Sequence, residues 1–358
     1  MNIRQATSAY EEWMRTCCRI VEADIRFKHD QMRKEPFLFF RATYYRWAQL
    51  WPDLCGDLAG APRVLAVGDL HIGSFGTWRD SEGRLCWGVD DFDEAWPLPY
   101  TNDLVRLAAS AKTVAGVGQL TTKPRPACEA ILEGYTKTLQ SGGSPFVLAE
   151  RDQYIEKLGI KAIKPAAGFW DKLDRLPVAR GVLPKDAQQA LSRTLPQPRP
   201  ECKIVRRKAG VGSLGQERFV ALAEWQGGWI ARELKALLPS ASVWLEGGKA
   251  DVRSYYQEAI DSAIRSHDPY QTVGGHWITR RLSPDSNPIE ISELPKQRDE
   301  EKLLRAMGAE AANVHLGRKR QRDAILSDLG KRKAGWLEAA ARSMAKAVVA
   351  EWKEYAGA

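Results

Sequence analysis

A short proline-rich stretch separates two parts of the chain that have different hydrophobic patterns. Residues 195–200 are Leu-Pro-Gln-Pro-Arg-Pro, and prolines so closely spaced cannot continue a helix and favour an extended connector. Residues 101–194 have mostly the apolar spacing of amphipathic helices, with Asn102 or Asp103 expected as the first N-cap, whereas the segment after the prolines has the composition of short strands. We therefore predict an α+β chain with a lobe boundary at this point.

The remaining elements follow from the same patterns. Helices are predicted over residues 8–26, 36–51, 251–265 and 300–316, and over a last helix with a stripe of Trp336, Ala340, Met344, Val348 and Trp352, which we interpret as core packing. Strands are predicted over residues 63–67 and 85–89, which we place in one small sheet, and over residues 203–207, 218–222, 229–234 and 276–282. The predicted organisation is a helical lobe over residues 1–195, a β-rich lobe over residues 201–295, and helices over residues 296–358 that return to the first lobe.

Composition limits the class of protein. With 358 residues, 44% of them hydrophobic, the chain can bury a sizeable core, which excludes wholesale disorder. No apolar run approaches the roughly 18 residues that a membrane span requires, so we expect no membrane partner and a cytoplasmic location. The formal charge of +8 is compatible with a partner that bears phosphate groups.

The densest group of reactive side chains lies around two of the predicted strands. Residues 68–76, here called the Asp69 loop, contain Asp69 and His71, and residues 90–94 are Asp-Asp-Phe-Asp-Glu at the end of a strand. Carboxylates at neighbouring strand ends can hold a divalent metal or accept a hydroxyl proton. Acidic residues at strand ends also form turns and caps, and a histidine can be a buried core residue, so this structural interpretation stays open.

A second motif follows the proline stretch. Residues 210–215, here called the glycine loop, have the spacing GxGxxG, and the segment after them has the pattern of a strand where a dinucleotide-binding motif would begin a helix. A glycine loop between two strands can lie over phosphates, as in protein kinases. A basic residue on the next strand would complete such a site, and both Lys235 and Arg232 are candidates.

These segments resemble known families. The Asp69 loop together with residues 91–93 is similar to the catalytic and metal-binding loops of the aminoglycoside-phosphotransferase branch of the protein-kinase-like superfamily. Five segments in one order (residues 35–41, the Asp69 loop, residues 90–94, residues 103–110 and the glycine loop) resemble the bacterial domain-of-unknown-function family 2252, over about residues 35–318.

The resemblance implies a role for each motif residue. Asp69 and His71 would be catalytic, with Asp69 orienting or deprotonating the acceptor, and Asp91, Asp93 and Ser74 would hold Mg²⁺. The nucleotide ATP would be bound by a further set of residues: Gly210, Gly212, Ser213, Gly215 and Lys235. Because Glu258 lies on the helix predicted after the strand of Lys235, we select it as the candidate carboxylate that holds the lysine. Ser74 stands where the superfamily usually has an asparagine metal ligand, which leaves open a catalytically degenerate protein that only binds nucleotide.

The order of the motifs is unusual for the superfamily. The catalytic segments precede the glycine loop, and residues 303–315 resemble the helix that normally leads directly into the catalytic loop. The resemblance therefore implies a two-lobed kinase-like fold whose motifs stand in circularly permuted order, a rearrangement that preserves packing when the new ends lie at the surface.

The predicted function is ATP- and Mg²⁺-dependent phosphotransfer to a hydroxyl group of an unknown small-molecule or protein acceptor, and nucleotidyl transfer would use most of the same residues. The alternative from a different class is a basic nucleic-acid-binding protein, because residues 318–322 and 331–333 are rich in lysine and arginine. Charge runs without interleaved aromatic residues are more often solvated helix faces. The sequence does not determine the oligomeric state.

Overall fold

The computed structural model describes residues 1–116, 118, 120–148, 153–248, 254–286, 300–317 and 319–357. The helices in chain order are α1 (Ile3–Cys17), α2 (Glu22–Lys34), α3 (Pro36–Ala42), α4 (Tyr44–Leu54), η1 (Gly56–Leu58), α5 (Tyr100–Gly116), α6 (Pro124–Ser141), α8 (Gln153–Ala162), α9 (Ala166–Asp174), α10 (Lys185–Ser192), α11 (Ala241–Leu245), α12 (Tyr256–Ser262), α13 (Glu300–His315), η3 (Lys319–Gln321), α14 (Arg322–Lys331) and α15 (Trp336–Ala356). Within the described residues, every helix is too short or too polar to cross a lipid bilayer.

The described strands form three antiparallel sheets. The strands are β1 (Arg63–Ala66), β2 (Phe75–Arg79), β3 (Leu85–Val89), β4 (Trp96–Pro99), β5 (Phe146–Val147), β6 (Lys203–Arg206), β7 (Arg218–Trp225), β8 (Gly228–Ala236), β9 (Thr272–Gly274) and β10 (Trp277–Leu282). One sheet has the order β6-β7-β8-β10-β9, a second has the order β2-β3-β5, and β1 pairs with β4. The mixed α+β class predicted from the sequence is confirmed.

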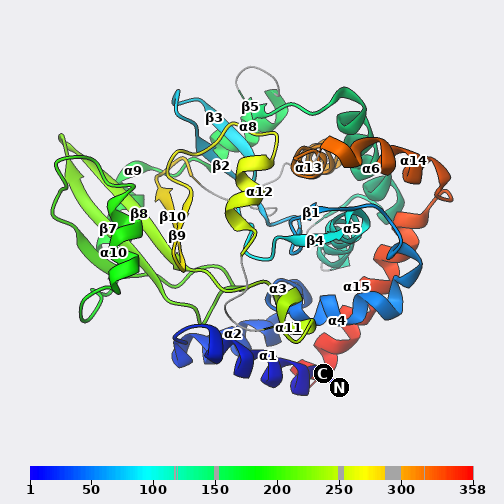
Figure 1. The fold of residues 1–358 in the computed structure, drawn as a ribbon, viewed down its shortest axis with the longest axis horizontal. Coiled ribbons are helices and arrows are strands. Elements are labelled where there is room, and N and C mark those ends of the chain that lie inside the picture. Colours follow the sequence, from blue (N-terminus) through cyan, green and yellow to red (C-terminus); the bar gives the residue numbers. More distant parts are fainter. Residues whose placement is uncertain are drawn as a thin grey trace.

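The two largest parts of the molecule lie at opposite ends of the view in Figure 1. The five-stranded sheet with α9 and α10 occupies the left side, and α5, α6, α13 and α15 occupy the right side. One face of the sheet packs Phe219, Leu234 and Trp277 against α10, and the other face packs Val220 and Leu282 against α9. The lobe boundary at residue 195 stays a prediction. Helices α9 and α10 precede this residue in the sequence but pack against the sheet that follows it.

Helices α6 and α13 approach closely because glycines lie at their contact. A Cβ atom at Gly134 would overlap the carbonyl oxygen of Arg305, and one at Gly308 would overlap the carbonyl oxygen of Ile131. Two facing glycines thus allow the backbones to meet. This contact fixes α13, whose last residue, His315, lies beneath the Asp69 loop.

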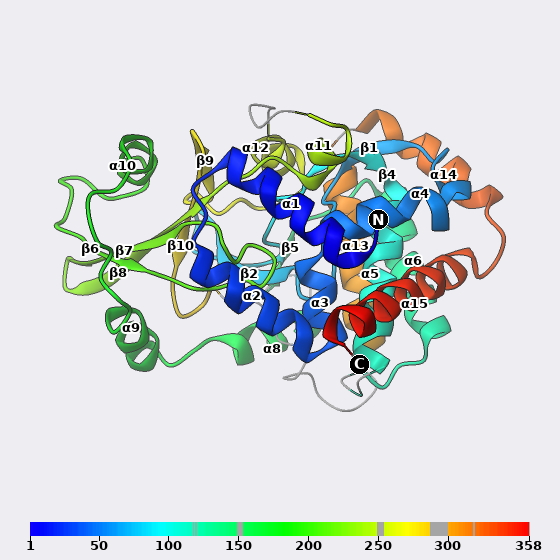
Figure 2. The same cartoon turned by 90° about the horizontal axis from the view of Figure 1, so that it is seen from below.

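The two predicted N-terminal helices are each divided in two. The predicted helix over residues 8–26 is wrong, because the chain leaves α1 at Cys17 and the backbone N–H of Val21 donates to the carbonyl of Gly215 at 2.8 Å, beside a β-bridge between Ile20 and Gln216. The predicted helix over residues 36–51 ends at Ala42 and resumes at Tyr44. Figure 2, the view from below, shows α1 and α2 lying across this face of the molecule, with α3 beside α2.

Two other predictions about local structure are wrong. Strands β1 and β3 do not share a sheet, because β3 pairs with β2 and β5 while β1 pairs with the proline-containing β4. Asn102 and Asp103 do not cap α5, which begins at Tyr100; the carboxylate of Asp103 instead accepts the backbone N–H groups of Val67 and Gly68.

The other predicted elements are found near their expected positions. Strands β6, β7, β8 and β10 and helices α13 and α15 are confirmed, and Met344 and Val348 of α15 belong to the largest hydrophobic core, as the stripe predicted. The helix predicted over residues 251–265 is shorter: α12 ends at Ser262, and residues 251–253 lie outside the described residues.

Candidate functional site

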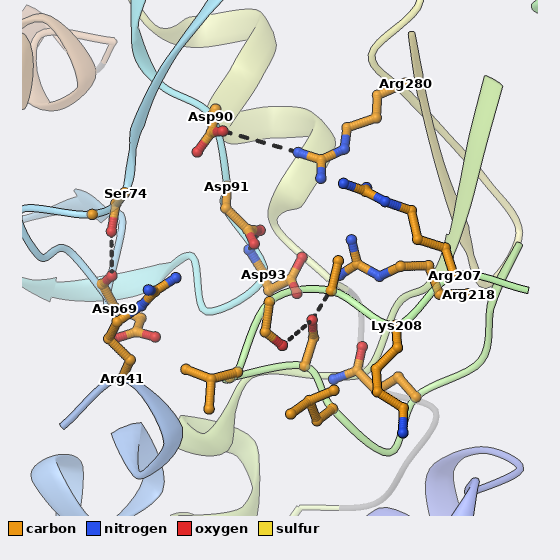
Figure 3. A pocket seen from close by; sticks show the side chains of 18 of the residues that line it. Arg41, Asp69, Ser74, Asp90, Asp91, Asp93, Arg207, Lys208, Arg218 and Arg280 are labelled. Atoms are coloured by element: carbon orange, nitrogen blue, oxygen red, sulfur yellow. Dashed lines mark hydrogen bonds and ion pairs between the residues drawn. The ribbon is translucent and has the colours of Figure 1, made fainter. Parts of the chain in front are cut away.

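A cavity of about 840 Å³ brings the separate sequence motifs together. Its lining comes from the Asp69 loop, the residues after β3, the glycine loop and β10, together with helices α2, α3 and α9. Figure 3 shows its charged side chains: Asp69, Asp90, Asp91 and Asp93 lie on one side, and Arg207, Lys208, Arg218 and Arg280 lie opposite them. Segments separated by more than one hundred residues thus face one shared space.

The Asp69 loop is fixed from beneath by Asp103. Asp103 is fully buried and its carboxylate accepts the N–H groups of Val67 at 2.7 Å and Gly68 at 2.9 Å, while Nε2 of His315 lies 3.0 Å from Oδ2. Gly68 has φ +80°, and a Cβ atom there would overlap the carbonyl oxygen of Glu94. The sharp turn before Asp69 therefore requires glycine at this position.

Ser74 and His71 shape the loop from within. The Ser74 hydroxyl donates to the carbonyl of Asp69 at 3.1 Å and accepts the N–H of His71 at 3.0 Å. Ser74 and His71 both line the cavity, and Nδ1 of His71 accepts the N–H of Gly73. Burial, followed by the charges of Arg41 and Arg106, holds the pKa of His71 well below its usual range.

Asp69 presents one carboxylate oxygen to the cavity. Its Oδ1 accepts a hydrogen bond from Nε of Arg106 at 2.7 Å and a second one from Nη2 of the same side chain. Within the described residues no hydrogen bond reaches Oδ2, and 23% of the side-chain surface is exposed. Burial raises the pKa of Asp69 against the opposing charges of Arg106 and Arg41. This arrangement suits a carboxylate that accepts a proton from a bound hydroxyl group.

Arg106 is held in an aromatic box. Its guanidinium carbon lies 4.2 Å from the ring centroid of Phe40, 5.0 Å from that of Tyr44 and 4.9 Å from that of Trp47, and the residue has no exposed surface. Cation–π contacts and the Asp69 carboxylate together compensate the buried charge. Arg106 was not among the predicted site residues, although a charge within the apolar run Leu-Val-Arg-Leu of α5 is itself a signal of a buried ion pair.

Asp91 and Asp93 meet at the ammonium group of Lys235. Nζ of Lys235 lies 3.0 Å from Oδ2 of Asp91 and also contacts Oδ2 of Asp93, and 46% of the Asp91 side chain faces open space. Burial raises the pKa of Asp91, but the charge of Lys235, a hydrogen bond with Asp93 and the charge of Arg280 together hold it below the usual range. Burial and the neighbouring charge of Asp91 raise the pKa of Asp93. The two predicted metal ligands, Asp91 and Asp93, are therefore ion-paired with Lys235, the predicted phosphate-binding lysine.

A buried glutamate gathers three arginines beside this pair. Glu233 is fully buried and accepts Nη1 of Arg218 at 3.1 Å, Nε of Arg280 at 2.6 Å and a nitrogen of Arg207. Burial opposes the charged carboxylate, but the three guanidinium groups hold the pKa of Glu233 well below its usual range. Glu233 neutralises only one of the three positive charges, and all three arginines line the cavity.

Asp90 connects the two acidic segments. Its backbone N–H donates to the carbonyl of Ser74 at 3.1 Å, and its carboxylate lies 4.0 Å from Nη1 of Arg280. Burial raises the pKa of Asp90 to about 6, with Arg280 opposing. Glu94, four residues later, lines the same cavity; burial raises its pKa to about 7, although the N–H of Ala241 donates to it.

The glycine loop reaches over Asp69. A Cβ atom at Gly212 would lie 4.0 Å from Oδ2 of Asp69, and the carbonyl of Gly212 accepts Nζ of Lys28 at 3.0 Å. Gly210 and Ser213 also line the cavity, and the Ser213 hydroxyl accepts Nη2 of Arg218 at 2.7 Å. Gly215 lies against Ile25 of α2 instead, outside the cavity lining, where its φ of +101° requires glycine.

Two further candidates lie away from the cavity. Arg232 is on the opposite face of β8 from Lys235: it donates to the carbonyl of Thr194 at 2.9 Å and stacks on Tyr270. The sequence alone could have distinguished the two candidates, because successive side chains of a strand point to opposite faces, which places Arg232 and Lys235 on different faces of β8. Glu258 is half-buried on α12 outside the cavity lining, and the carboxylates that pair with Lys235 are Asp91 and Asp93.

Part of the basic C-terminal segment is bound within the fold. Arg322 donates to the carbonyls of Leu139 and Gln140 at the end of α6, and Arg332 pairs with Asp328 at 2.7 Å. Arg318 lies outside the described residues.

The comparisons with known proteins cover only part of this site. Residues 19–164 match the model of a family described as uncharacterized protein conserved in bacteria (DUF2252). The match contains the Asp69 loop and residues 90–94 and ends before the glycine loop, so the predicted family resemblance is supported over these residues and not as far as residue 318. Searches of curated proteins and of solved structures find no match. The kinase resemblance stays a prediction.

Proposed function

We propose that the protein is an ATP- and Mg²⁺-dependent phosphotransferase acting on a hydroxyl group, with a two-lobed kinase-like fold in circularly permuted order. One observation carries the proposal: Asp91 and Asp93 line the same cavity as Asp69 and the glycine loop, and both carboxylates pair with the ammonium group of Lys235, which lies outside the cavity lining. Phosphoryl transfer needs such parts, because its catalysis is mainly positioning and charge stabilisation.

The aspartates fit a magnesium ion. Asp93 Oδ1 is buried and accepts no hydrogen bond within the described residues, and carboxylate oxygens are the ligands that Mg²⁺ prefers. The described residues contain no group of three or more His, Cys, Asp or Glu side chains placed for a metal. Magnesium commonly uses one or two carboxylates together with water and substrate phosphates, so Asp91 and Asp93 are sufficient, and the ion would supply charge stabilisation to the phosphates.

The opposite wall fits the phosphates of a nucleotide. The glycine loop offers backbone N–H groups, and Arg207, Arg218 and Arg280 supply the surplus positive charge around Glu233. Ser74 keeps its hydroxyl bound within the Asp69 loop, so we assign it to loop geometry; as a metal ligand it stays a prediction.

Asp69 would act on the acceptor. Its Oδ2 accepts the hydroxyl proton while the acceptor oxygen forms a bond to the γ-phosphorus of ATP. The bond from that phosphorus to the bridging oxygen breaks, and its electron pair leaves with ADP. Arg106 keeps Asp69 ionised and oriented through Oδ1.

The contact between α13 and the Asp69 loop supports the permuted order. In the sequence, α13 follows the loop by more than two hundred residues, yet His315 at its end lies 3.0 Å from Asp103, which binds the backbone of the loop. A helix that normally leads into a catalytic loop would occupy this place.

Calorimetric titration of ATP, with and without Mg²⁺, tests the proposal. We expect the wild-type protein to bind ATP more tightly with Mg²⁺, and Asp91→Asn to remove that dependence because one metal ligand loses its charge. Asp174→Asn, which alters an exposed pair with Lys203, is the matched control and should bind as the wild type does. Absence of binding by the wild type at millimolar ATP would contradict the proposal and direct attention to nucleic acid.

A second candidate is a nucleotide-binding protein without transferase activity, favoured by the serine at position 74, whose hydroxyl is already bound twice within its own loop. It predicts magnesium-dependent ATP binding with no hydrolysis and no transfer. Measuring the release of ADP from ATP·Mg²⁺ by the wild type distinguishes the two, because only the transferase breaks the bond to the γ-phosphate.

A further inference from the structure

Arg41 lies in the cavity beside the proposed catalytic residue. It belongs to the last turn of α3, and its guanidinium carbon would be 3.7 Å from a Cβ atom at Gly73 in the Asp69 loop. Its backbone oxygen would be 3.0 Å from a Cβ atom at Gly212. Figure 3 shows the side chain rising from its helix toward Asp69. Arg41 is therefore between the Asp69 loop and the tip of the glycine loop.

This guanidinium has no partner among the described residues. Its Nε is buried without a hydrogen bond, and its described contact is with the ring of Phe37 at 5.8 Å. Asp69, the nearest carboxylate of the loop, is already bound by Arg106 through Oδ1. A half-buried arginine without a counter-ion is unfavourable unless another group compensates it, so the site lacks one negative charge.

Lys28 adds a second cation at the same place. The residue is only 3% exposed and lines the cavity, and its ammonium group donates to the carbonyl of Gly212 at 3.0 Å. An ammonium group has three donors, and the described structure gives this one no carboxylate partner. Arg41 and Lys28 thus both adjoin Gly212 with unused hydrogen-bond donors.

We propose that Arg41 and Lys28 form an oxyanion subsite beside Asp69 that binds a phosphate or carboxylate group. The inference rests on the proposed function and narrows it: the anion is either the γ-phosphate of ATP or an anionic group on the acceptor alcohol. Both sources present the same charged oxygens, for which a guanidinium and an ammonium group are suited.

The experiment compares Arg41→Gln with the wild type by calorimetry, using ATP·Mg²⁺, ADP·Mg²⁺ and inorganic phosphate added to the ADP·Mg²⁺ complex as probes. If the subsite holds the γ-phosphate, the variant binds ATP about tenfold more weakly and ADP unchanged. If it holds the acceptor anion, both nucleotides bind as before and phosphate binding falls by about tenfold. The subsite is overturned if phosphate and ATP both bind the variant as they bind the wild type.

Two controls keep the result interpretable. Arg33→Gln removes an exposed arginine of α2 that pairs with Asp30, and it should leave all three affinities unchanged; Arg41→Lys should restore part of the lost affinity if charge is what matters. Phosphate is also titrated into protein without nucleotide. If the wild type binds phosphate in an Arg41-dependent manner but binds no nucleotide, the proposed function fails and the subsite stands. If the wild type binds nucleotide but no phosphate, and Arg41→Gln binds ATP as tightly as the wild type does, the subsite fails and the proposed function stands.

Discussion

The charged residues buried beneath the Asp69 loop differ from those on the cavity surface in how completely they are paired. Beneath the loop, Asp103 is bound by two backbone N–H groups and by His315, and Arg106 is bound by Asp69 inside three aromatic rings. In the cavity, Arg41 has no partner among the described residues and Asp91 keeps nearly half of its side chain exposed. We infer that Asp103 and Arg106 hold the loop in place, whereas Arg41 and the exposed part of Asp91 are available to a ligand.

The largest expected effect is the loss of stability in Asp103→Ala. Three buried hydrogen-bonding groups would lose their acceptor, so we expect the free energy of unfolding to fall by about 3–5 kcal/mol. Asp91→Ala should cost less than about 1 kcal/mol, because nearly half of the Asp91 side chain is exposed and Asp93 still pairs with Lys235 in the variant. Urea unfolding followed by tryptophan fluorescence measures both, and similar losses in the two variants would abolish the distinction.

The next effect sharpens the role of Arg106 as a positioning residue. In Arg106→Gln the pKa of Asp69 should rise, since its nearest cation is gone, and the rising limb of the pH–rate profile for ATP hydrolysis should move to higher pH. We expect the rate at neutral pH to fall by about 100-fold with ATP·Mg²⁺ affinity retained. A purely structural role would instead lower affinity and rate together without moving the profile, and Arg106→Lys should recover part of the rate.

A smaller effect concerns Glu94, at the border of the two regions. Its pKa is raised from 4.5 to about 7 by burial, so the free energy of unfolding falls as the pH rises from 4.5 to about 7; the loss is absent below 4.5 and complete above about 7. Glu94→Gln cannot ionise and keeps the oxygen that accepts the N–H of Ala241. We expect its melting temperature to exceed that of the wild type by roughly 2–4 °C at pH 8, with the difference shrinking toward pH 5; a constant difference would contradict the assignment.

The smallest expected effect is at the rim of the cavity. Lys208 pairs with Asp24 of α2 at 3.0 Å, with 45% of the lysine side chain exposed. Lys208→Ala should change the free energy of unfolding by about 0.5 kcal/mol or less, and added salt should remove even that. A loss comparable to that of Asp103→Ala would mean that the cavity surface also carries the fold.

Sequence patterns predicted β1, β3, β6, β7, β8 and β10, because their apolar runs are short and bounded by glycine and polar residues, but they missed β2 and β4. They also predicted that Asp69, Asp91, Asp93 and Lys235 contribute to one site; the three aspartates line one cavity, and Lys235 pairs with Asp91 and Asp93 from outside its lining. The break between α1 and α2 was not predictable from periodicity, since it comes from pairing between Ile20 and Gln216.

The partners of the charged residues were mostly beyond the sequence. Asp103 has the pattern of an N-cap, and only the tertiary fold brings Val67 and Gly68 to its carboxylate. Glu258 was expected to hold Lys235, whereas the lysine pairs with the two aspartates. Local spacing identifies which side chains are chemically suited to a site, and long-range packing decides which of them meet.

The most direct test is a crystal structure of the protein with Mg²⁺ and a non-hydrolysable ATP analogue. We expect a metal ion about 2.1 Å from a carboxylate oxygen of Asp91, with the phosphates between that ion and the glycine loop and the γ-phosphate next to Asp69. A nucleotide bound elsewhere, or phosphates without a metal at Asp91 and Asp93, would contradict it.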